Sequence, residues 1–287
     1  MKVLSLFDGI SCGMVALERA GIPVERYVAY EIEPNAIKIS KKNYPQIEHC
    51  GDVTKADFTQ YEGFDMVIGG SPCQDISNMN INGKGLEGER SGLFYQYLRA
   101  LQEVKPKYFL IENVVGKKEA INGITSALGV EPILIDSKLL SAQKRRRYYW
   151  TNIPNVCQPK DKNILMKDVL LPWEEAEEGY LTEGRLKWLL SDNGKKAIAK
   201  RYAAINGDKC ACLTVRSEPS WNCQYIEENG KYRHLTPTEY ERMQTLPDGY
   251  TLGVPNNKRY ATLGNGWTAD VIAHIFSHLP IESGVFG

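Results

Sequence analysis

Short, mostly apolar runs alternate with helix-like segments along the first half of the sequence, and most of them end in a glycine or an acid. They lie at residues 3–7, 28–30, 47–50, 66–68, 107–111 and 133–136. Short runs of this kind are typical of parallel strands that are buried on both faces. Strands that alternate with helices indicate βαβ units. The sequence therefore predicts an α/β fold with a doubly wound, mostly parallel sheet that binds ligands at the carboxyl ends of its strands.

One of these strands delivers a cysteine. Residues 66–68 lead through two glycines to Pro72 and Cys73, and a long polar stretch follows at residues 75–91. Two interpretations of Cys73 are open. Free cysteines are commonly small buried side chains. A thiol held by a proline at a ligand-binding edge, with a loop to cover it, is instead typical of a nucleophile.

Glycines and acids follow the first three strands in a fixed order. Gly9 and Gly13 flank the turn after the first strand, Glu31 ends the second, and Asp52 follows the third. This order is the layout of a pocket for an adenosyl-type cofactor, in which the turn brings the backbone close and the acids bind ribose and adenine. The missing third glycine of the dinucleotide motif argues against an NAD-dependent enzyme.

Further charged residues converge on Cys73. Glu112 ends the strand at 107–111, and a carboxylate beside a thiol is typical of a functional site. Strand alternation places Arg145 and Arg147 on one face of their segment. These three side chains are therefore candidates for the chemistry of the site.

Composition limits the class of protein. The hydrophobic fraction of 43% and the charged fraction of 24% are those of a soluble globular protein. No apolar run approaches the roughly 20 residues that span a bilayer, and the N-terminus enters a strand directly without a signal peptide. We therefore expect a cytoplasmic protein with no membrane partner and with reduced cysteines.

Charge alone does not identify a partner. The 35 basic and 35 acidic residues cancel, so there is no global argument for nucleic-acid binding. Basic residues do cluster at 145–147 and 185–201. The second cluster indicates either a solvated helix face or a surface that follows phosphates.

The metal-ligating residues do not form a standard motif. Cys210, Cys212 and Cys223 lack a clear fourth ligand and a C-x-x-C pair. His274 and His278 are four residues apart on an expected helix, but no glutamate follows His274 to complete a zinc-protease motif. We therefore expect no metal.

The strand–helix alternation stops near residue 154. We predict three parts: a catalytic domain over 1–153, a small irregular domain over 154–232, and a return to the first domain over 233–287. The expected elements of the last two parts are a helix at 181–190, strands at 212–215 and 224–226, a hairpin turn at Asn229-Gly230, and helices at 235–243 and 268–278.

Taken in order, seven motifs resemble those of the DNA (cytosine-5)-methyltransferases. They are Phe7-Asp8-Gly9-Ile10-Ser11-Cys12-Gly13, Glu31, Asp52, Pro72-Cys73-Gln74, Glu112-Asn113-Val114, Gln143-x-Arg145-x-Arg147 and Gly264-Asn265-Gly266-Trp267. The resemblance spans nearly the whole chain and is weakest in the second domain. Residues 135–138, residues 147–150 and Trp267 look closest to the animal de novo enzymes. We expect a compact bacterial or phage member, with no room for added reader domains.

The resemblance implies a Rossmann-like, class I methyltransferase fold with a small target-recognition domain. It implies methyl transfer from S-adenosylmethionine to C5 of a cytosine flipped out of double-stranded DNA at a specific sequence. Cys73 would add to C6 of the base, and Glu112 would hold N3 and the exocyclic amine. Arg147 would hold O2, and Arg145 would brace the region of the thiol.

The resemblance also implies the binding residues. The cofactor contacts are Phe7 on the adenine, Asp8, Gly9, Ile10, Gly13, Glu31, Ile32, Asp52, Val53, Pro72, Asn265 and Trp267. Ile32 stands where many members have tryptophan, which predicts aliphatic packing. The DNA contacts are Ser77 and Arg90 in the loop after Cys73, and Arg216, Ser217, Trp221 and Asn222 in the second domain.

Several questions stay open at this stage. The recognition sequence and a partner restriction enzyme leave no signal in the sequence, and we expect a monomer with oligomers not excluded. One alternative is a tRNA cytosine-5 methyltransferase on the same scaffold. Another is an inactive DNA-binding homologue, although Cys73, Glu112, Arg145 and Arg147 are all present.

Overall fold

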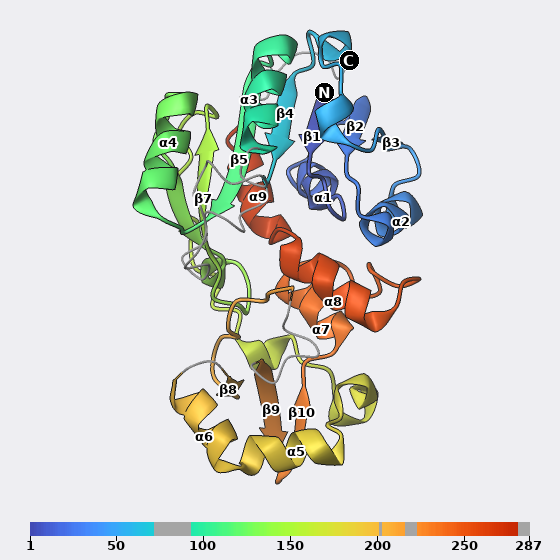
Figure 1. Ribbon diagram of the computed structural model, residues 1–287, viewed down its shortest axis with the longest axis vertical. Helices are drawn as coiled ribbons and strands as arrows, with labels where there is room; N and C mark the ends of the chain where they lie inside the picture. The colour runs from blue at the N-terminus through green and yellow to red at the C-terminus, as the bar shows by residue number, and fades with distance from the viewer. Residues whose placement is uncertain (72–92, 201–202, 216–222, 281–287) are drawn as a thin grey trace.

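The computed structural model describes residues 1–71, 93–200, 203–215 and 223–280. Within these ranges a seven-stranded sheet has the order β3-β2-β1-β4-β5-β7-β6 (Figure 1). Its strands are β1 (Lys2–Leu6), β2 (Arg26–Tyr30), β3 (Glu48–His49), β4 (Met66–Gly69), β5 (Tyr108–Val114), β6 (Ile133–Asp136) and β7 (Arg146–Thr151). Strands β1 to β5 are parallel, and β7 runs antiparallel to both β5 and β6. The predicted mostly parallel α/β sheet is confirmed.

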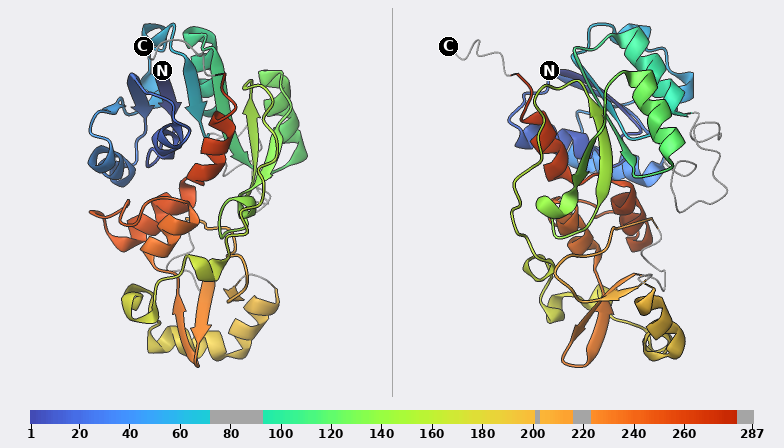
Figure 2. Two further views of the ribbon diagram at one scale, coloured as in Figure 1. Left: turned by 180° about the vertical axis from the view of Figure 1, so that it is seen from behind. Right: turned by 90° about the vertical axis from the view of Figure 1, so that its left-hand side faces the viewer.

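Helices cover both faces of the sheet (Figure 2). On one face lie α1 (Cys12–Arg19), α2 (Pro34–Asn43) and α9 (Ala269–Phe276), and on the other lie α3 (Leu93–Val104) and α4 (Lys118–Leu128). Neighbouring residues of one strand enter opposite cores: Val3 packs with the first group of helices and Leu4 with the second. Burial on both faces explains why the strands are apolar throughout.

The strand order reverses between β1 and β4, which are hydrogen-bonded neighbours. In doubly wound sheets the loops diverge at such a point and leave a crevice beyond the strand ends. The segments after Leu6 and Gly69 therefore meet at one place, as the sequence predicted for the glycine turn and the strand that leads to Cys73.

A second, three-stranded sheet has the order β10-β9-β8. It consists of β8 (Ala204–Ile205), β9 (Gln224–Glu228) and β10 (Lys231–His234), flanked by α5 (Glu183–Leu190) and α6 (Asp192–Ala199). Asn229 and Gly230 have φ values of 52° and 76°, which is the left-handed geometry of a tight hairpin turn. The predicted hairpin is confirmed, while the domain boundaries at 153 and 232 stay predictions.

The strand predicted at 212–215 is wrong. Side chains of the catalytic part occupy its backbone groups: the Leu213 N–H donates to Gln143 Oε1 at 3.4 Å, and its carbonyl accepts from Arg145 at 3.0 Å. The chain then returns through α7 (Pro237–Met243) and α8 (Asn256–Asn265) to α9. Helix α8, which contains the first half of the Gly264–Trp267 motif, was not predicted from the sequence. Within the described ranges, no helix is long and apolar enough to cross a membrane.

Candidate active site

A cavity of about 370 Å³ opens at the carboxyl ends of β1, β2, β4 and β5. It brings together residues from eight separate parts of the chain. Its walls contain most of the predicted site: Phe7, Asp8, Gly9, Glu31, Ile32, Asp52, Val53, Glu112, Arg145, Arg147, Asn265 and Trp267. The predicted cofactor and base residues thus lie around one space.

Some predicted residues lie elsewhere. Ile10 and Gly13 are buried behind the wall. A Cβ on Gly13 would lie 2.6 Å from Ile68 Cδ1, so this glycine lets α1 pack closely on the sheet. Eight predicted residues lie outside the described ranges: Pro72, Cys73, Ser77, Arg90, Arg216, Ser217, Trp221 and Asn222.

Glu112 is the centre of one end of the cavity, here called the base end. Arg147 Nε lies 2.8 Å from Glu112 Oε1, and Trp267 Nε1 donates to Oε2 at 3.2 Å. Glu112 is only 9% exposed, and each of its carboxylate oxygens has a partner. A buried charge held by an opposite charge and a second donor has a fixed position. The group can present one acceptor and one cationic donor to a ligand.

Gly70 makes room for this arrangement. A Cβ at this position would lie 3.0 Å from Trp267 Nε1 and 3.2 Å from Glu112 Oε2. Packing against Trp267 and Glu112 therefore explains why residue 70 is a glycine, which was not predicted from the sequence. The signal was present in the paired glycines at the strand end.

Arg145 is a mostly buried residue of the wall and joins two segments. Its guanidinium donates to the carbonyls of Leu213 at 3.0 Å, Gly264 at 3.2 Å and Gly266 at 2.9 Å. Burial, together with the neighbouring charge of Arg147, lowers the pKa of Arg145, although an arginine stays protonated. Most of its hydrogen bonds go to backbone carbonyls, and one goes to Cys212 Sγ at 3.5 Å, so Arg145 acts as a positioning residue for Gly266 and the following Trp267. Contact with the region of Cys73 stays a prediction.

Two buried glutamines extend this brace. Gln143 Nε2 donates to Met243 O and to Gln244 Oε1, both at 2.8 Å. Gln244 Nε2 then donates to Leu263 O at 2.7 Å and Gly266 O at 3.1 Å. Sequence reasoning missed Gln244, because no local pattern distinguishes it from other helix-end glutamines.

Asn113 connects the base end to the cysteine strand. Its Nδ2 donates to Ser71 Oγ at 3.2 Å, and its Oδ1 accepts from the Val114 N–H at 2.8 Å. Ser71 comes two residues before Cys73. The second residue of the Glu112-Asn113-Val114 motif therefore fixes the chain at Ser71, two residues before Cys73.

The opposite end of the cavity, here called the cofactor end, is built around Glu31. Its carboxylate accepts from the backbone N–H groups of Gly9, Ile32 and Glu33, each at 2.8 Å. Glu33 caps α2 by accepting from the Ala36 N–H at 2.6 Å. Glu31 thus fixes the glycine turn and still faces the cavity.

The glycine turn is strained. Phe7 and Ser11 have φ values of 57° and 60°, a region that costs non-glycine residues on the order of 1 kcal/mol or more. Asp8 ties the turn down by accepting from Ser5 Oγ at 2.6 Å and Tyr27 Oη at 2.7 Å. Burial raises the pKa of Asp8, and the hydrogen bonds from Ser11, Ser5 and Tyr27 oppose that rise.

Asp52 and Ile32 complete the cofactor end near solvent. Asp52 Oδ1 accepts from the backbone N–H of Thr54 at 2.9 Å and from its hydroxyl at 2.8 Å. These bonds lower the pKa of Asp52, so the group is a carboxylate at neutral pH. Ile32 is 71% exposed and offers an open aliphatic face beside it.

Cys12, a cysteine of the described wall, is a poor nucleophile. Cys12 lines the cavity and is 3% exposed. Burial raises its pKa to about 12, so the thiol stays protonated at neutral pH. A protonated thiol does not attack an electrophilic carbon at a useful rate.

Comparison with known proteins agrees with this geometry. A family model described as C-5 cytosine-specific DNA methylase matches residues 1–155 and 172–280. The chain belongs to this family. The match leaves out 156–171, which contains the connector after β7, and includes every described residue of the cavity wall.

The relatives of this chain include bacterial type II methyltransferases and orphan methyltransferases of Bacillus phages. The chain is 29% identical to type II methyltransferase M.Eco47II of Escherichia coli, over 92% of this chain and 75% of that protein. It is 26% identical to type II methyltransferase M.NlaX of Neisseria lactamica, over 96% and 94%. The Entamoeba histolytica methyltransferase EhMeth has a TM-score of 0.81 over 97% of both chains at 19% identity, which shows that the methylase fold is shared.

Proposed function

We propose that the protein transfers a methyl group from S-adenosylmethionine to C5 of a cytosine flipped out of double-stranded DNA, through a covalent bond between Cys73 and C6. The observation that carries this proposal is the Glu112–Arg147–Trp267 group at the base end of the cavity. Cytosine has an acceptor at O2, an acceptor at N3 and an exocyclic amine. A guanidinium beside a carboxylate matches these groups in type and order.

The chain supplies the chemistry at the base. Cys73 thiolate adds to C6, and the electron pair of the C5–C6 double bond moves so that C5 becomes nucleophilic. Glu112 stabilises the charge that develops on N3 and the exocyclic amine, and Arg147 stabilises the charge on O2. Once C5 has taken the methyl group, for which the sulfonium gives up its carbon–sulfur bond, a base removes the C5 proton, the C5–C6 double bond re-forms and the thiolate leaves. Cys12, with its raised pKa, is not a substitute for Cys73.

The walls of the cofactor end fit S-adenosylmethionine. Two carboxylates, Glu31 and Asp52, suit ribose hydroxyls and an adenine amine, and Phe7, Ile32 and Val53 offer apolar surface for the ring. Asn265 and Trp267 close the cavity from the other side. When bound, the cofactor supplies an electrophilic methyl group on a sulfonium. The chain orients the cofactor and excludes water around that methyl.

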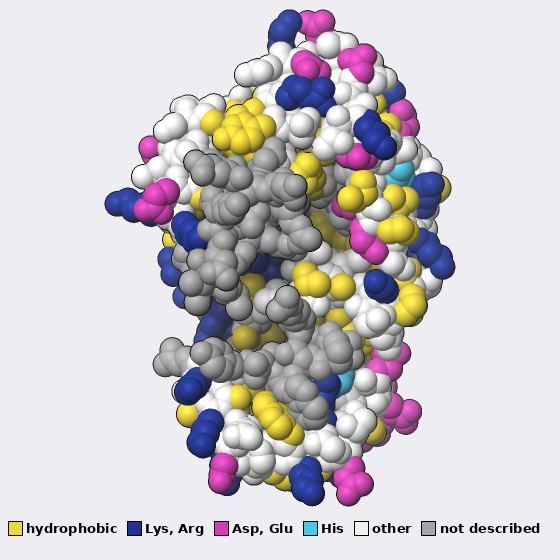
Figure 3. Space-filling model, in the orientation of Figure 1, with side chains coloured by type: hydrophobic (Ala, Val, Ile, Leu, Met, Phe, Trp, Pro, Cys, Tyr) yellow, Lys and Arg dark blue, Asp and Glu magenta, His cyan; other side chains and the backbone are white. Residues whose placement is uncertain are grey.

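Several parts of the proposal concern DNA. Ser77 and Arg90 are proposed as phosphate contacts, and Arg216, Ser217 and Trp221 as sequence-reading contacts in the small domain. A basic edge on the lower part of the molecule supports a nucleic-acid partner (Figure 3): Lys195, Lys196 and Lys200 on and after α6 are all exposed. Exposed lysines bind phosphates with little sequence preference. We propose a monomer that acts on cytoplasmic DNA.

A trapping experiment tests the proposal. Genomic DNA methylated by the purified protein is first sequenced after bisulfite treatment to find the modified site. A duplex with 5-fluorocytosine at that site should then form an adduct that mass spectrometry locates at Cys73, because fluorine blocks the last elimination step. Cys73→Ala should form no adduct, while Cys50→Ser should form it normally. Methylation of tRNA but not duplex DNA would replace the proposed substrate, and the absence of any adduct would overturn the mechanism.

A further inference from the structure

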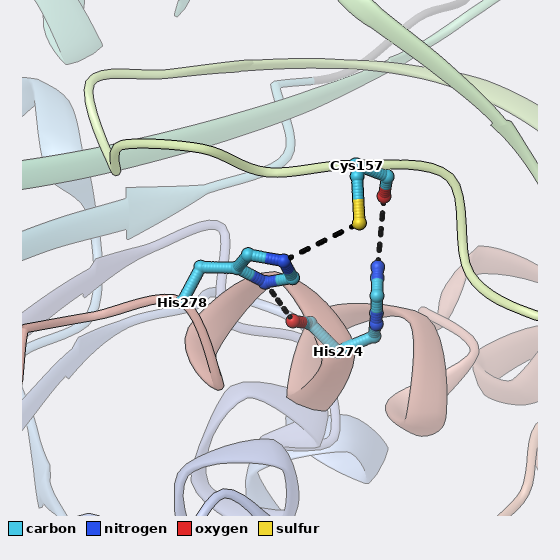
Figure 4. Close-up of side chains that lie close together, drawn as sticks. All are labelled: Cys157, His274 and His278. Carbon is cyan, nitrogen blue, oxygen red and sulfur yellow. Dashed lines mark hydrogen bonds between the residues drawn. The ribbon is translucent and has the colours of Figure 1, made fainter.

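A cysteine and two histidines meet outside the cavity. Cys157 lies in the connector after β7, His274 lies in the last turn of α9, and His278 lies two residues beyond the end of that helix (Figure 4). None of the three lines the cavity, so the proposed methyl transfer does not use them. The sequence analysis considered the two histidines alone, because Cys157 is more than 100 positions away in the chain.

A backbone carbonyl determines which ring nitrogen of His278 carries the hydrogen. His278 Nδ1 lies 2.8 Å from the carbonyl oxygen of His274. A carbonyl can only accept a hydrogen bond, so Nδ1 carries the hydrogen and Nε2 of the neutral ring has a free lone pair. That lone pair faces Cys157 Sγ at 3.6 Å. Metal-binding histidines are commonly oriented in this way, by a carbonyl on the far nitrogen.

The spacing of the three groups suits a tetrahedral ion. Zinc bonds of about 2.3 Å to sulfur and about 2.0 Å to nitrogen place two such ligands roughly 3.5 Å apart. The Cys157 Sγ to His278 Nε2 distance of 3.6 Å already has this value. The three ligand atoms all lie within 4.8 Å of one another. His274 Nε2 donates to the Cys157 carbonyl at 2.8 Å, so on binding it exchanges this hydrogen bond for the bond to the ion, with the ring hydrogen moving to Nδ1.

We propose that Cys157, His274 and His278 bind one divalent ion of the zinc class, with water as the fourth ligand. One thiolate and two imidazoles are ligands for zinc or cobalt and not for magnesium or calcium, which prefer oxygen. The thiol gives its proton to solvent on binding, and Cys157 is exposed, so the ion has access. The bound ion would join the connector to α9, at a place where Lys162 already pairs with Asp270 at 2.9 Å.

Cobalt is the probe for this site. The purified, chelator-treated protein, kept reduced with a phosphine, is titrated with Co²⁺ alone. One equivalent should produce the strong visible bands of tetrahedral Co²⁺ and a thiolate charge-transfer band in the near ultraviolet. Adding Zn²⁺ should remove both. Zn²⁺ should also raise the Tm of the wild-type protein, because an ion that binds only the folded state stabilises it.

Matched variants assign the ion to these residues. Cys157→Ser and His278→Gln should each weaken Co²⁺ binding by more than about 10- to 100-fold. A loss of about 10- to 100-fold is typical when a residue is removed that only hydrogen-bonds to a metal ligand. Each should also lose the zinc-dependent rise in Tm, while circular dichroism confirms that it is folded. Cys50→Ser removes another exposed thiol and should leave binding unchanged. Wild-type protein without the thiolate band, or a band that survives in Cys157→Ser, would overturn the proposal.

Discussion

The two ends of the cavity are built in different ways. The cofactor end consists of short segments that follow successive strands, and backbone N–H groups hold its central carboxylate, Glu31. The base end consists of side chains from β5, β7 and the segment after α8, and these side chains hold one another. Glu112 and Trp267 are 155 positions apart in the chain. The first end is thus organised locally and the second by tertiary packing.

This difference determines how each end responds to substitution. A backbone-held carboxylate keeps most of its surroundings when its charge is removed, because the N–H donors belong to the turn itself. A carboxylate held by a guanidinium and an indole leaves a buried cation without its partner when it is neutralised. We therefore expect the larger losses of function at the base end.

Glu112→Gln should have the largest effect. The amide cannot neutralise Arg147 or stabilise the protonated N3 of the base, and loss of such a group typically costs on the order of 10²- to 10⁴-fold in rate. The measurement is kcat for methyl transfer to duplex DNA at saturating cofactor. Cofactor affinity, measured by calorimetry, should change little because Glu112 belongs to the other end.

A matched control separates this from a general effect of charge. Glu119→Gln removes an exposed carboxylate from the first turn of α4, outside the cavity, and should leave kcat unchanged. Equal losses in both variants, or a loss of cofactor affinity in Glu112→Gln as large as the loss of rate, would contradict the division into two ends.

Gly264→Ala should have the next largest effect. A Cβ at this position would lie 2.4 Å from the Thr214 carbonyl carbon and 2.6 Å from its oxygen, so α8 or the 213–215 segment has to move. Overpacking of this kind costs about 1–3 kcal/mol, which exceeds the gain of up to about 1 kcal/mol from replacing a helical glycine. Denaturant unfolding should show a net loss of stability.

Gly184→Ala provides the opposite sign. Gly184 lies in α5, and a Cβ there meets nothing within 4 Å. This variant should be neutral or more stable by up to about 1 kcal/mol. A destabilised Gly184→Ala, or a Gly264→Ala protein as stable as the wild type, would show that packing against Thr214 is not what requires the glycine.

The same difference explains what the sequence could predict. Glu31, Asp52 and the glycine turn follow strands directly, so strand periodicity alone placed them at one edge. Glu112 could be placed at that edge too. Its partner Trp267 and the brace through Arg145 could not be derived from periodicity, because they depend on contacts between segments more than 100 positions apart.

The errors have a common physical cause. Residues 212–215 have the composition of a strand, but side chains of Gln143 and Arg145 take the backbone groups that a neighbouring strand would use. The Gln143-x-Arg145 pattern was identified correctly as an alternating face. What the pattern cannot reveal is that Gln143 and Arg145 bind the backbone of residues 213 and 264–266, while Arg147 on the same face reaches Glu112. The proximity of Cys157 to His274 and His278 could not be predicted either, because it too depends on tertiary contacts between distant segments.

Glu31→Gln should have a moderate effect at the cofactor end. Hydrogen bonds to a charged group are worth about 1.5–3 kcal/mol, so binding of S-adenosylhomocysteine should weaken by about 10- to 100-fold. The KM for cofactor should rise while kcat at saturation stays near the wild-type value. Glu48→Gln, which breaks an exposed pair with Arg26, is the control and should leave cofactor binding unchanged. A fall in kcat without a change in KM would place Glu31 in the chemical step instead.

Asp52→Asn should have the smallest effect. Asparagine caps a helical turn as well as aspartate does, so the bonds to Thr54 are kept and only charge is lost. Exposed charges contribute little, so cofactor affinity should fall by less than about fivefold. Because the bonds to Thr54 lower the pKa of Asp52, the carboxylate stays ionised as pH falls toward its ordinary value. The affinity ratio of wild type to variant should therefore stay constant between about pH 5 and pH 8. A ratio that collapses within this range would mean that Asp52 is protonated there, and that the local Thr54 bonds do not control its charge.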